Sequence, residues 1–535
     1  MDSRKAEASP RSLFDLWPWL FVLLVLLLAG YVRYRLLDMP LERDEGEYAY
    51  AGQLLLQGIP PYELAWNMKL PGTYFAYALG MAAFGQTPAG IHATLIVVNS
   101  LTIIFVFLLG RRLFGPLAGI AACATFGILS VSPAVMGMAA HANHFVILFA
   151  VPATLLLWKG EEFYRWYVFF FSGMFYGLAF LMKQPGICFC LFAVLFVIWS
   201  AVQNRAIFSS VFLRKMCFLI LGMVLPLALT YKGLELAGVL DKFRFWTFTY
   251  AASYATEMSP REGITSFLDY AGKKWLIYFA FLGFIIVSLP FALRDRAYRN
   301  QVVFALAFLF FSILGVAMGL NFREHYFILF LPALGLFVGM AILSLQYATA
   351  NRFLKIIPPL VCLLILGWSV YQQRRFFFQL PANSVSRIIY TGDTPFVDMP
   401  AVGNYIRTNS PPSATVAVIG SEPEIYFYAK RHSATGYIYM YALMEPQPYA
   451  SQMQHEMMSE IETNKPEFLV YVPNPDSWNI RPSSDQTIFK WLNQYSSGYD
   501  KVFALDTTTA LSKGGKPVKT TNADVVVYER KASGS

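Results

Sequence analysis

Charged residues are scarce in this 535-residue chain, where Asp, Glu, Lys and Arg together make up only 14% of the sequence. Soluble domains carry about 25%, so the composition excludes an ordinary soluble protein. Hydrophobic residues instead reach 56%, with 47 Phe and 31 Tyr. Apolar runs of roughly 20 residues, the length that crosses a bilayer, recur along most of the chain. The composition therefore predicts a polytopic α-helical membrane protein.

Cysteine is also rare, and its placement excludes one kind of architecture. The five cysteines all lie in hydrophobic runs, at Cys123, Cys188, Cys190, Cys217 and Cys362. The more polar C-terminal part of the chain has none, so we expect no disulfide framework and no cysteine-based zinc site there. Cys188 and Cys190 are two residues apart and would point to different faces of a helix, which favours core packing.

Eleven apolar stretches have about the length of membrane-spanning helices. We predict them near residues 16–34, 88–109, 115–133, 144–158, 166–182, 186–202, 216–237, 274–293, 301–319, 325–345 and 355–373. The first stretch has basic residues before it, as a secretory signal does. It lacks a small-residue cleavage site and is long enough to span, so we expect a retained helix.

The distribution of basic residues predicts the orientation of these spans. The net charge is +9, but Lys and Arg are scattered over short loops and form no basic face interleaved with aromatic rings, so we expect no nucleic-acid partner. Short loops rich in Lys and Arg stay in the cytoplasm. With eleven spans, the acidic segment 42–47 and the C-terminal region then lie on the extracytoplasmic side of the cytoplasmic (inner) membrane.

Two loops on the predicted outer side are too long to be simple connectors. The loop 35–87 carries Pro and Gly breakers, which predict short helices along the membrane interface, with Tyr62, Trp66 and Tyr74 as anchors at headgroup level. The loop 238–273 is also rich in aromatic residues. We expect the two amphipathic loops to enclose one cavity on the outer face.

The composition changes at about residue 376, where hydrophobic runs shrink to strand length. The chain therefore divides into a transmembrane domain, 1–375, and a soluble extracytoplasmic α/β domain, 376–535. Buried strands are predicted at 415–419, 468–472 and 524–528, and helices at 449–463 and 484–496. Ser421 and Glu424 have the spacing of a capping box. No Gly-x-Gly-x-x-Gly follows the first strand, which argues against a dinucleotide site.

Four carboxylates crowd together directly after the first span, at Glu42, Asp44, Glu45 and Glu47. Acids at a membrane face can bind a divalent cation, share protons, or act as a general base toward an attacking hydroxyl or amine. Each of these roles requires that they be held together, away from bulk water. The alternative is a solvated helix start, because acidic residues stabilise the positive end of a helix.

Basic and histidine residues also occur in the predicted outer loops. Lys69 precedes a Pro-Gly break, Lys183 lies at a helix turn, and Arg323, His325 and Tyr326 lie together between two long spans. Cations at this depth can contact a lipid phosphate, although an interfacial lysine can also simply extend toward water. His141 and His144 could ligate a metal from one helix face, or form ordinary hydrogen bonds in a loop.

Four motifs resemble those of the GT-C superfamily of glycosyltransferases that use polyprenyl-phosphate sugars, the clan of protein O-mannosyltransferases and lipid A aminoarabinose transferases. They are DEGEYAYAG (44–52), KLPGTY (69–74), FLMKQPG (180–186) and REHYFILFLPAL (323–334). The resemblance covers residues 15–375. It implies a transmembrane glycosyltransferase with a soluble outer domain after the last span.

The resemblance also implies roles for individual residues. Asp44 matches the first-loop catalytic aspartate of the family, with Glu45 beside it, and Lys69 matches the lysine that holds the donor phosphate. Lys183 and Arg323 match basic positions that contact the same phosphate. His325 and Tyr326 match a pair that begins a helix and faces the cavity.

The implied reaction is an inverting displacement at the anomeric carbon, with polyprenyl phosphate as leaving group and a glycan, lipid or protein of the cell envelope as acceptor. No cofactor is certain. A divalent metal is one option, although some relatives carry an acid where this chain has Ala142, Asn143 and His144.

Two other classes stay open from the sequence. A transporter or flippase for polyprenyl-linked lipids would also place cations around a cavity, but should show matching interrupted spans in two halves. A non-catalytic envelope assembly protein would tolerate neutralisation of the acids at 42–47.

Overall fold

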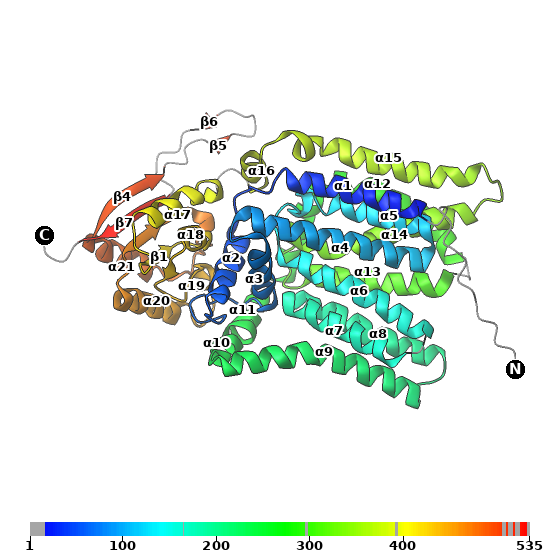
Figure 1. Ribbon diagram of the computed structural model, residues 1–535, viewed down its shortest axis with the longest axis horizontal. Coiled ribbons are helices and arrows are strands. Elements are labelled where there is room, and N and C mark those ends of the chain that lie inside the picture. The colour runs from blue at the N-terminus through cyan, green and yellow to red at the C-terminus, as the bar shows by residue number, and fades with distance from the viewer. Residues whose placement is uncertain are drawn as a thin grey trace.

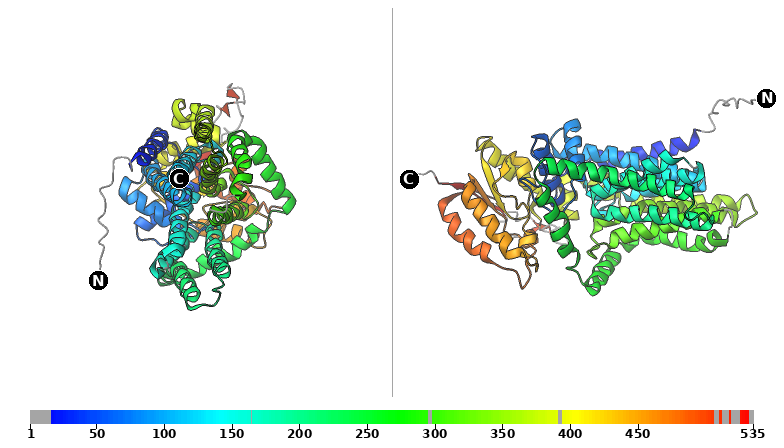
Figure 2. Two further views of the ribbon diagram at one scale, coloured as in Figure 1. Left: turned by 90° about the vertical axis from the view of Figure 1, so that its right-hand side faces the viewer. Right: turned by 90° about the horizontal axis from the view of Figure 1, so that it is seen from below.

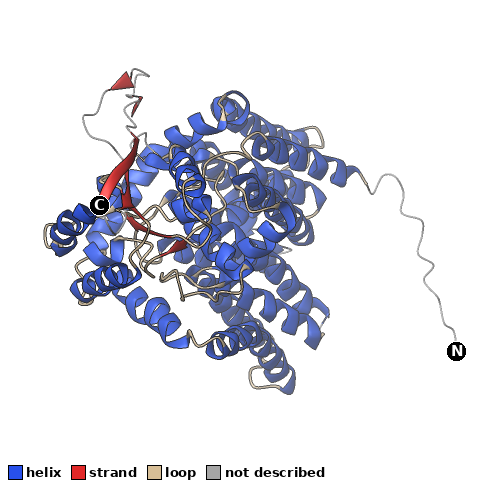
Figure 3. Cartoon of the chain, turned by 60° about the vertical axis from the view of Figure 1, so that its left-hand side comes forward, coloured by secondary structure: helices blue, strands red, loops and turns tan. Residues whose placement is uncertain are grey.

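The protein is elongated, with long apolar helices at one end and a small sheet at the other (Figure 1). The computed structural model describes residues 16–163, 165–294, 298–390, 394–505, 510–511, 517–518 and 525–531. Short helices of the outer loops lie between the two ends (Figure 1). The strands gather at the end opposite the long helices, as Figure 3 shows.

Each of the eleven predicted spans coincides with a helix. They are α1 (Trp17–Tyr34), α4 (Pro88–Phe114), α5 (Pro116–Leu129), α6 (Ala142–Phe163), α7 (Trp166–Met182), α8 (Ile187–Gln203), α9 (Ser210–Leu236), α12 (Pro260–Arg294), α13 (Arg299–Ala317), α14 (Leu331–Tyr347) and α15 (Ile357–Gln372). Within the described residues, nine helical stretches are long and apolar enough to cross a membrane. The helices α5 and α7 are shorter, at 14 and 17 residues. The chain is thus a multi-pass membrane protein.

Small residues allow the long helices to pack closely, as is usual in bilayers. A Cβ atom on Gly173 of α7 would overlap the carbonyl oxygen of Leu219 on α9, and one on Gly222 of α9 would overlap that of Phe170 on α7. The helices run roughly parallel and form a bundle when viewed along their length (Figure 2). The bundle fixes where the outer ends of its helices meet.

The two long loops, 35–87 and 238–273, contain short helices, as predicted. The first holds α2 (Arg43–Leu56) and α3 (Gly72–Phe84), and the second holds α10 (Leu240–Arg244), the π-helix η4 (Phe245–Tyr250) and α11 (Ala251–Ala255). The predicted interfacial anchors are wrong: Tyr62, Trp66 and Tyr74 are all buried. Trp66 packs against Tyr437, with ring centroids 4.8 Å apart, because the C-terminal region covers this loop.

The C-terminal region forms a five-stranded sheet in the order β2-β1-β3-β7-β4. Its strands are β1 (Thr415–Ile419), β2 (His432–Ser433), β3 (Phe468–Tyr471), β4 (Tyr499–Leu505) and β7 (Val525–Arg530), and a separate pair is formed by β5 (Ala510–Leu511) and β6 (Pro517–Val518). β1 pairs in parallel with β2 and β3, whereas β7 is antiparallel to β3 and β4. The three predicted strands are confirmed, apart from Asp524, which lies outside the described residues.

Helices cover this sheet and join it to the bundle. They are α16 (Ala382–Ile389), α17 (Met399–Thr408), α18 (Glu424–Ala429), α19 (Tyr441–Met444), α20 (Ala450–Asn464) and α21 (Thr487–Tyr495). The helices predicted at 449–463 and 484–496 correspond to α20 and α21. The predicted capping box is wrong, because α18 begins at Glu424 without a side-chain cap. The Ser421 hydroxyl instead accepts a hydrogen bond from the Met440 amide at 2.8 Å.

The C-terminal region packs directly on α2. A Cβ atom on Gly46 would lie 2.5 Å from the Glu424 Cβ and 2.6 Å from its backbone nitrogen, so α2 and α18 touch at a glycine. The Arg43 guanidinium completes this contact with an ion pair to Glu422 at 2.9 Å. The first turn of α2 is therefore held between the bundle and the sheet.

Candidate active site

A cavity of about 810 Å³ lies where the loops 35–87 and 238–273, the neighbouring ends of the bundle helices and the C-terminal region meet. Six of the seven site residues predicted from the sequence line it: Asp44, Lys69, Lys183, Arg323, His325 and Tyr326. They come from positions up to 282 residues apart (326 − 44) in the chain. The expectation that the two long loops border one cavity agrees with this lining, which also includes Trp66 and Trp246.

Asp44 lies in the first turn of α2 and is held by Lys69. The Lys69 ammonium is 2.6 Å from Asp44 Oδ1 and 2.9 Å from Glu47 Oε2. The Tyr439 hydroxyl donates a second hydrogen bond to Asp44, at 3.1 Å. Burial, the largest single effect, would raise the pKa of Asp44, but the charge of Lys69 and the smaller effects of His325, His141 and Lys183 together outweigh it and hold that pKa well below its usual range. Asp44 is therefore a carboxylate in this arrangement.

Glu45 points away from the cavity and is fully buried. Its Oε1 lies 3.1 Å from His92 Nε2 on α4 and accepts a 2.6 Å hydrogen bond from the Ala140 amide. Glu45 and Glu42 also form a capping box at the start of α2. Glu42 and Glu45 thus stabilise the start of a helix, as one of the two predicted alternatives held. They do so as buried residues, whereas that alternative expected solvated ones.

Lys183 and Arg323 are the cations of the cavity that lack an acidic partner. Within the described part of the chain, neither forms an ion pair with a carboxylate. Lys183 follows α7, and its ammonium lies 4.5 Å from the centroid of the Tyr326 ring. Burial lowers the pKa of Lys183 to about 7, and the nearby charges of Lys69 and Arg323 act in the same direction. Both side chains are free to bind an anion.

His325 and His141 stack beside Asp44. Their ring centroids are 4.2 Å apart, and His325 Nε2 is 4.0 Å from Asp44 Oδ2. Burial lowers the pKa of His141 to about 4. Ligand atoms of the three residues lie within 4.8 Å of one another, and one carboxylate with two imidazoles is a set that suits zinc. His144, the other candidate ligand, lies outside this group.

Sequence reasoning missed the part of the cavity that the C-terminal region supplies. Tyr439, Tyr441 and Glu445 line it, and Arg43 lines it from α2. The Arg43 guanidinium donates a 2.5 Å hydrogen bond to the Tyr441 hydroxyl. No spacing or motif marks these residues, because they come together only through a fold contact between segments almost 400 residues apart.

A comparison with family models supports the resemblance seen in the motifs. Residues 69–229 match the family described as dolichyl-phosphate-mannose-protein mannosyltransferase. This segment includes Lys69, His141 and Lys183. Among curated proteins, none matches this sequence significantly.

Solved structures share the fold at low sequence identity. ArnT from Cupriavidus metallidurans, solved with undecaprenyl phosphate, is 14% identical with a TM-score of 0.61, and the match covers 97% of this chain and 98% of that one. The oligosaccharyltransferase AglB from Archaeoglobus fulgidus, in complex with an inhibitory peptide and a dolichol-phosphate, is 12% identical with a TM-score of 0.53, over 87% and 70% of the two chains.

A further structure of the Archaeoglobus fulgidus oligosaccharyltransferase, in complex with zinc and sulfate, is 13% identical with a TM-score of 0.50, over 93% and 72% of the chains. The chain thus shares its fold with these solved structures. This likeness and the family match over residues 69–229 agree with the resemblance to the GT-C superfamily that the motifs predicted.

Proposed function

We propose that this protein is a glycosyltransferase that moves a sugar from a polyprenyl-phosphate donor to an acceptor of the cell envelope. The observation that carries this proposal is the pairing of charges in the cavity. An ionised Asp44 lies near two cations, Lys183 and Arg323, that have no acidic partner among the described residues. A nucleophile-activating acid beside a free anion site is what transfer from a phosphate-linked sugar requires.

The donor phosphate binds between Lys183 and Arg323 in this proposal. Both residues lie where helices of the bundle end, Lys183 directly after α7 and Arg323 directly before the 3-10 helix η6 (Glu324–Phe330) that leads into α14. This position lets the phosphate meet the cations while its prenyl chain stays beside the apolar helices. Undecaprenyl phosphate and dolichol-phosphate bind to the related structures ArnT and AglB, which supports a donor of this class.

Asp44 acts as the general base in this proposal. The acceptor hydroxyl attacks the anomeric carbon and loses its proton to Asp44, while the bond from that carbon to the phosphate oxygen breaks and the electron pair leaves with the polyprenyl phosphate. A single displacement of this kind inverts the anomeric configuration. Lys69 contacts Asp44 at 2.6 Å, and we propose that it turns toward the donor phosphate when the donor binds, which raises the basicity of Asp44.

We assign Glu45 a positioning role and no contact with the substrate. Its bonds to His92 and to the Ala140 amide fix α2 against α4 and against the segment that carries His141. A divalent cation would be held by Asp44, His141 and His325. When bound, such an ion supplies Lewis-acid polarisation of phosphate oxygens.

Residues of the C-terminal region line the cavity, and that region lies at one end of the helix bundle (Figure 1). We propose that this end is extracytoplasmic, that the membrane is the cytoplasmic (inner) membrane, and that 376–535 is the soluble outer domain. The basic loops at the opposite end support this orientation.

The test measures lipid-phosphate binding and sugar transfer separately. Purified protein in nanodiscs is titrated with undecaprenyl phosphate, as wild type and as Lys183→Ala, Arg323→Ala and Lys232→Ala. Lys232 is exposed, pairs with Glu235 at 2.7 Å and lies near the outer end of α9, so it controls for the loss of one positive charge.

We expect the two cavity variants to bind at least about tenfold more weakly and Lys232→Ala to bind like wild type. Transfer is then followed with labelled polyprenyl-phosphate sugars and an envelope extract. Equal losses in all three variants, or wild-type protein that does not bind undecaprenyl phosphate, would contradict the proposal.

A further inference from the structure

The end of the cavity formed by the C-terminal region contains a buried carboxylate with a free oxygen. Glu445 follows α19 directly and is 3% exposed. Its Oε2 accepts a hydrogen bond from the Tyr250 hydroxyl of η4. Its Oε1 has no hydrogen-bond partner among the residues that the structure describes. Glu445 nevertheless lines the cavity, so this oxygen is placed to receive a donor from a ligand.

A buried acceptor without a partner is costly in a folded protein, and native structures usually avoid it unless a ligand or a functional role explains it. Burial raises the pKa of Glu445 to about 7, against the opposing effect of the Tyr250 hydrogen bond. Among the described residues, Lys183 and Arg323, the proposed phosphate-binding residues, form no hydrogen bond with Oε1 of Glu445.

Aromatic side chains line the same cavity as Glu445. Tyr250 and Tyr254 come from the second outer loop, and Tyr439 and Tyr441 come from the C-terminal region. Tyr439 also reaches Asp44 at 3.1 Å, so the aromatic group extends up to the proposed base. Rings with polar edges suit a ligand that has apolar faces and many hydroxyl groups.

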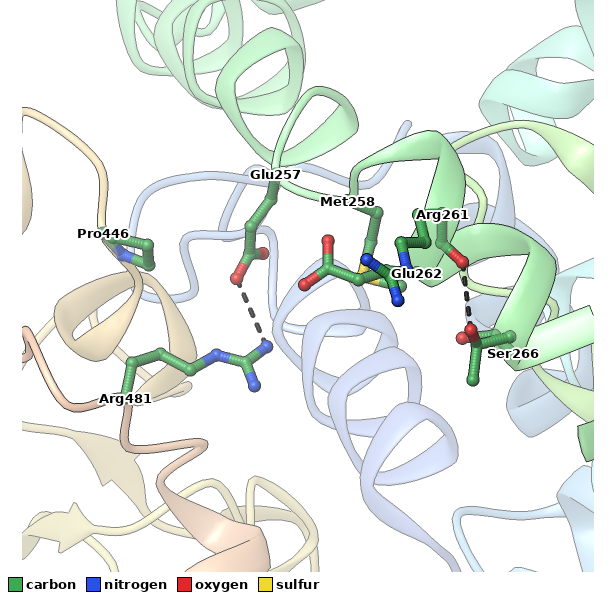
Figure 4. Close-up of a pocket in the computed structure, with 8 residues that line it drawn as sticks. Glu257, Met258, Arg261, Glu262, Ser266, Pro446 and Arg481 are labelled. Atoms are coloured by element: carbon green, nitrogen blue, oxygen red, sulfur yellow. Dashed lines mark hydrogen bonds and ion pairs between the residues drawn. The ribbon is translucent and has the colours of Figure 1, made fainter.

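A second hollow lies near this end of the cavity, because two of its lining residues, Pro446 and Arg481, directly follow the cavity residues Glu445 and Ile480 in the chain. Its volume is about 580 Å³, and Pro446, the neighbour of Glu445, lines it together with Glu257 and Arg481. Figure 4 shows Glu257 and Arg481 directed toward each other from different segments. Their ion pair measures 3.3 Å, and Arg481 is 43% exposed. A single partly exposed pair of this kind contributes little stability and opens easily to a ligand.

We propose that this end of the cavity binds the acceptor, and that the acceptor is a glycan whose hydroxyl groups donate to Glu445 while its ring faces stack on the tyrosines. The inference rests on the proposed glycosyltransferase function and names its substrate class. The glycan reaches the cavity past Glu257 and Arg481. Its attacking hydroxyl lies beside Asp44, where Tyr439 joins the two ends.

The experiment uses full-length protein in nanodiscs, with methyl glycosides of glucose, galactose and mannose as probes and a Ser/Thr-rich peptide as the competing acceptor. Binding is measured by saturation-transfer NMR, and undecaprenyl phosphate binding is measured on the same samples. The variants are Glu445→Ala, Glu445→Gln, which keeps the shape of the side chain, and Lys183→Ala at the phosphate end. Glu462→Ala is the matched control, because Glu462 bonds to Trp491 on the exposed side of α20, away from the cavity.

We expect at least one glycoside to bind wild type, to bind about tenfold or more weakly to both Glu445 variants, and to bind Lys183→Ala and Glu462→Ala normally. Undecaprenyl phosphate should bind the Glu445 variants like wild type. The inference is overturned if no glycoside binds, if the Glu445 variants bind normally, or if a Ser/Thr-rich peptide binds in their place. Failure of the lipid phosphate to bind wild type would instead overturn the proposed function.

Discussion

Lys183 gives the most direct prediction, because its charge depends on pH in the physiological range. Burial lowers its pKa to about 7, whereas a free lysine has a pKa of about 10.4. Phosphate binding favours the charged ammonium, so the bound form keeps its proton to a higher pH. The contribution of Lys183 to the affinity for undecaprenyl phosphate is therefore fully present below pH 7, and it falls as the pH rises above 7.

The size of the effect follows from the titration. One unit above its pKa, only about a tenth of the lysine is charged before binding, so the dissociation constant rises by up to about tenfold per pH unit. The phosphate itself does not contribute between pH 7.5 and 9, because its second pKa is about 6. Lys69 and Arg323 stay charged across this window and do not add to the slope.

The assay is a titration of nanodisc-embedded protein with undecaprenyl phosphate at pH 7, 8 and 9. Lys183→Arg, whose guanidinium does not lose its proton, should bind with little pH dependence. Lys183→Met should bind weakly at every pH, without the slope. Glu445→Gln controls for the other group with a pKa of about 7 and should keep the slope of wild type. A slope in Lys183→Arg equal to that of wild type would refute the reasoning.

Three further predictions concern the start of α2 and the histidines. Asp44→Asn should lower transfer about 10²- to 10⁴-fold, as expected for loss of a general base, with unchanged thermal unfolding; near-normal turnover would remove Asp44 from the mechanism. Gly46→Ala should destabilise the protein by about 1–3 kcal/mol, because the added methyl group overlaps Glu424. Thermal unfolding measures the effect, and Gly272→Ala, whose added methyl group meets nothing within 4 Å, is the control. Equal unfolding midpoints for the two variants would contradict the close contact. After reconstitution with zinc, elemental analysis should find about one zinc ion per chain, and His141→Ala should lose that ion. An unchanged zinc content in His141→Ala would exclude a site formed by Asp44, His141 and His325.

The spans could be predicted from the sequence because the bilayer sets their length. All eleven apolar stretches became helices, and the strands β1 and β3 were also found from short buried runs. Helix ends were less exact: α12 begins at Pro260, 14 residues (274 − 260) before the predicted start, since an amphipathic segment continues directly into the span. Hydropathy marks where the apolar span begins, at Leu276, and not where the helix begins.

The site could be predicted only where its residues belong to local motifs at helix ends. Asp44, Lys69, Lys183 and Arg323 each follow or precede an apolar run, and the bundle then brings those ends together. The sequence does not show whether Asp44 or Glu45 faces the cavity. Neighbouring helix residues point about 100° apart, and only the packing of α2 against α4 decides which of the two side chains lies in the cavity. Trp66 shows the same limit, since an aromatic residue beside a polar loop has the same pattern whether lipid or protein covers it.

The contact between α2 and α18 has a consequence for hybrid proteins built from relatives of this chain. Gly46 and Arg43 are fitted to Glu424 and Glu422, so the C-terminal region and the helix that carries Asp44 form one matched unit. Exchanging residues 376–535 alone would disrupt the contact between α2 and α18 beside Asp44. A functional chimera would have to exchange α2 together with that region.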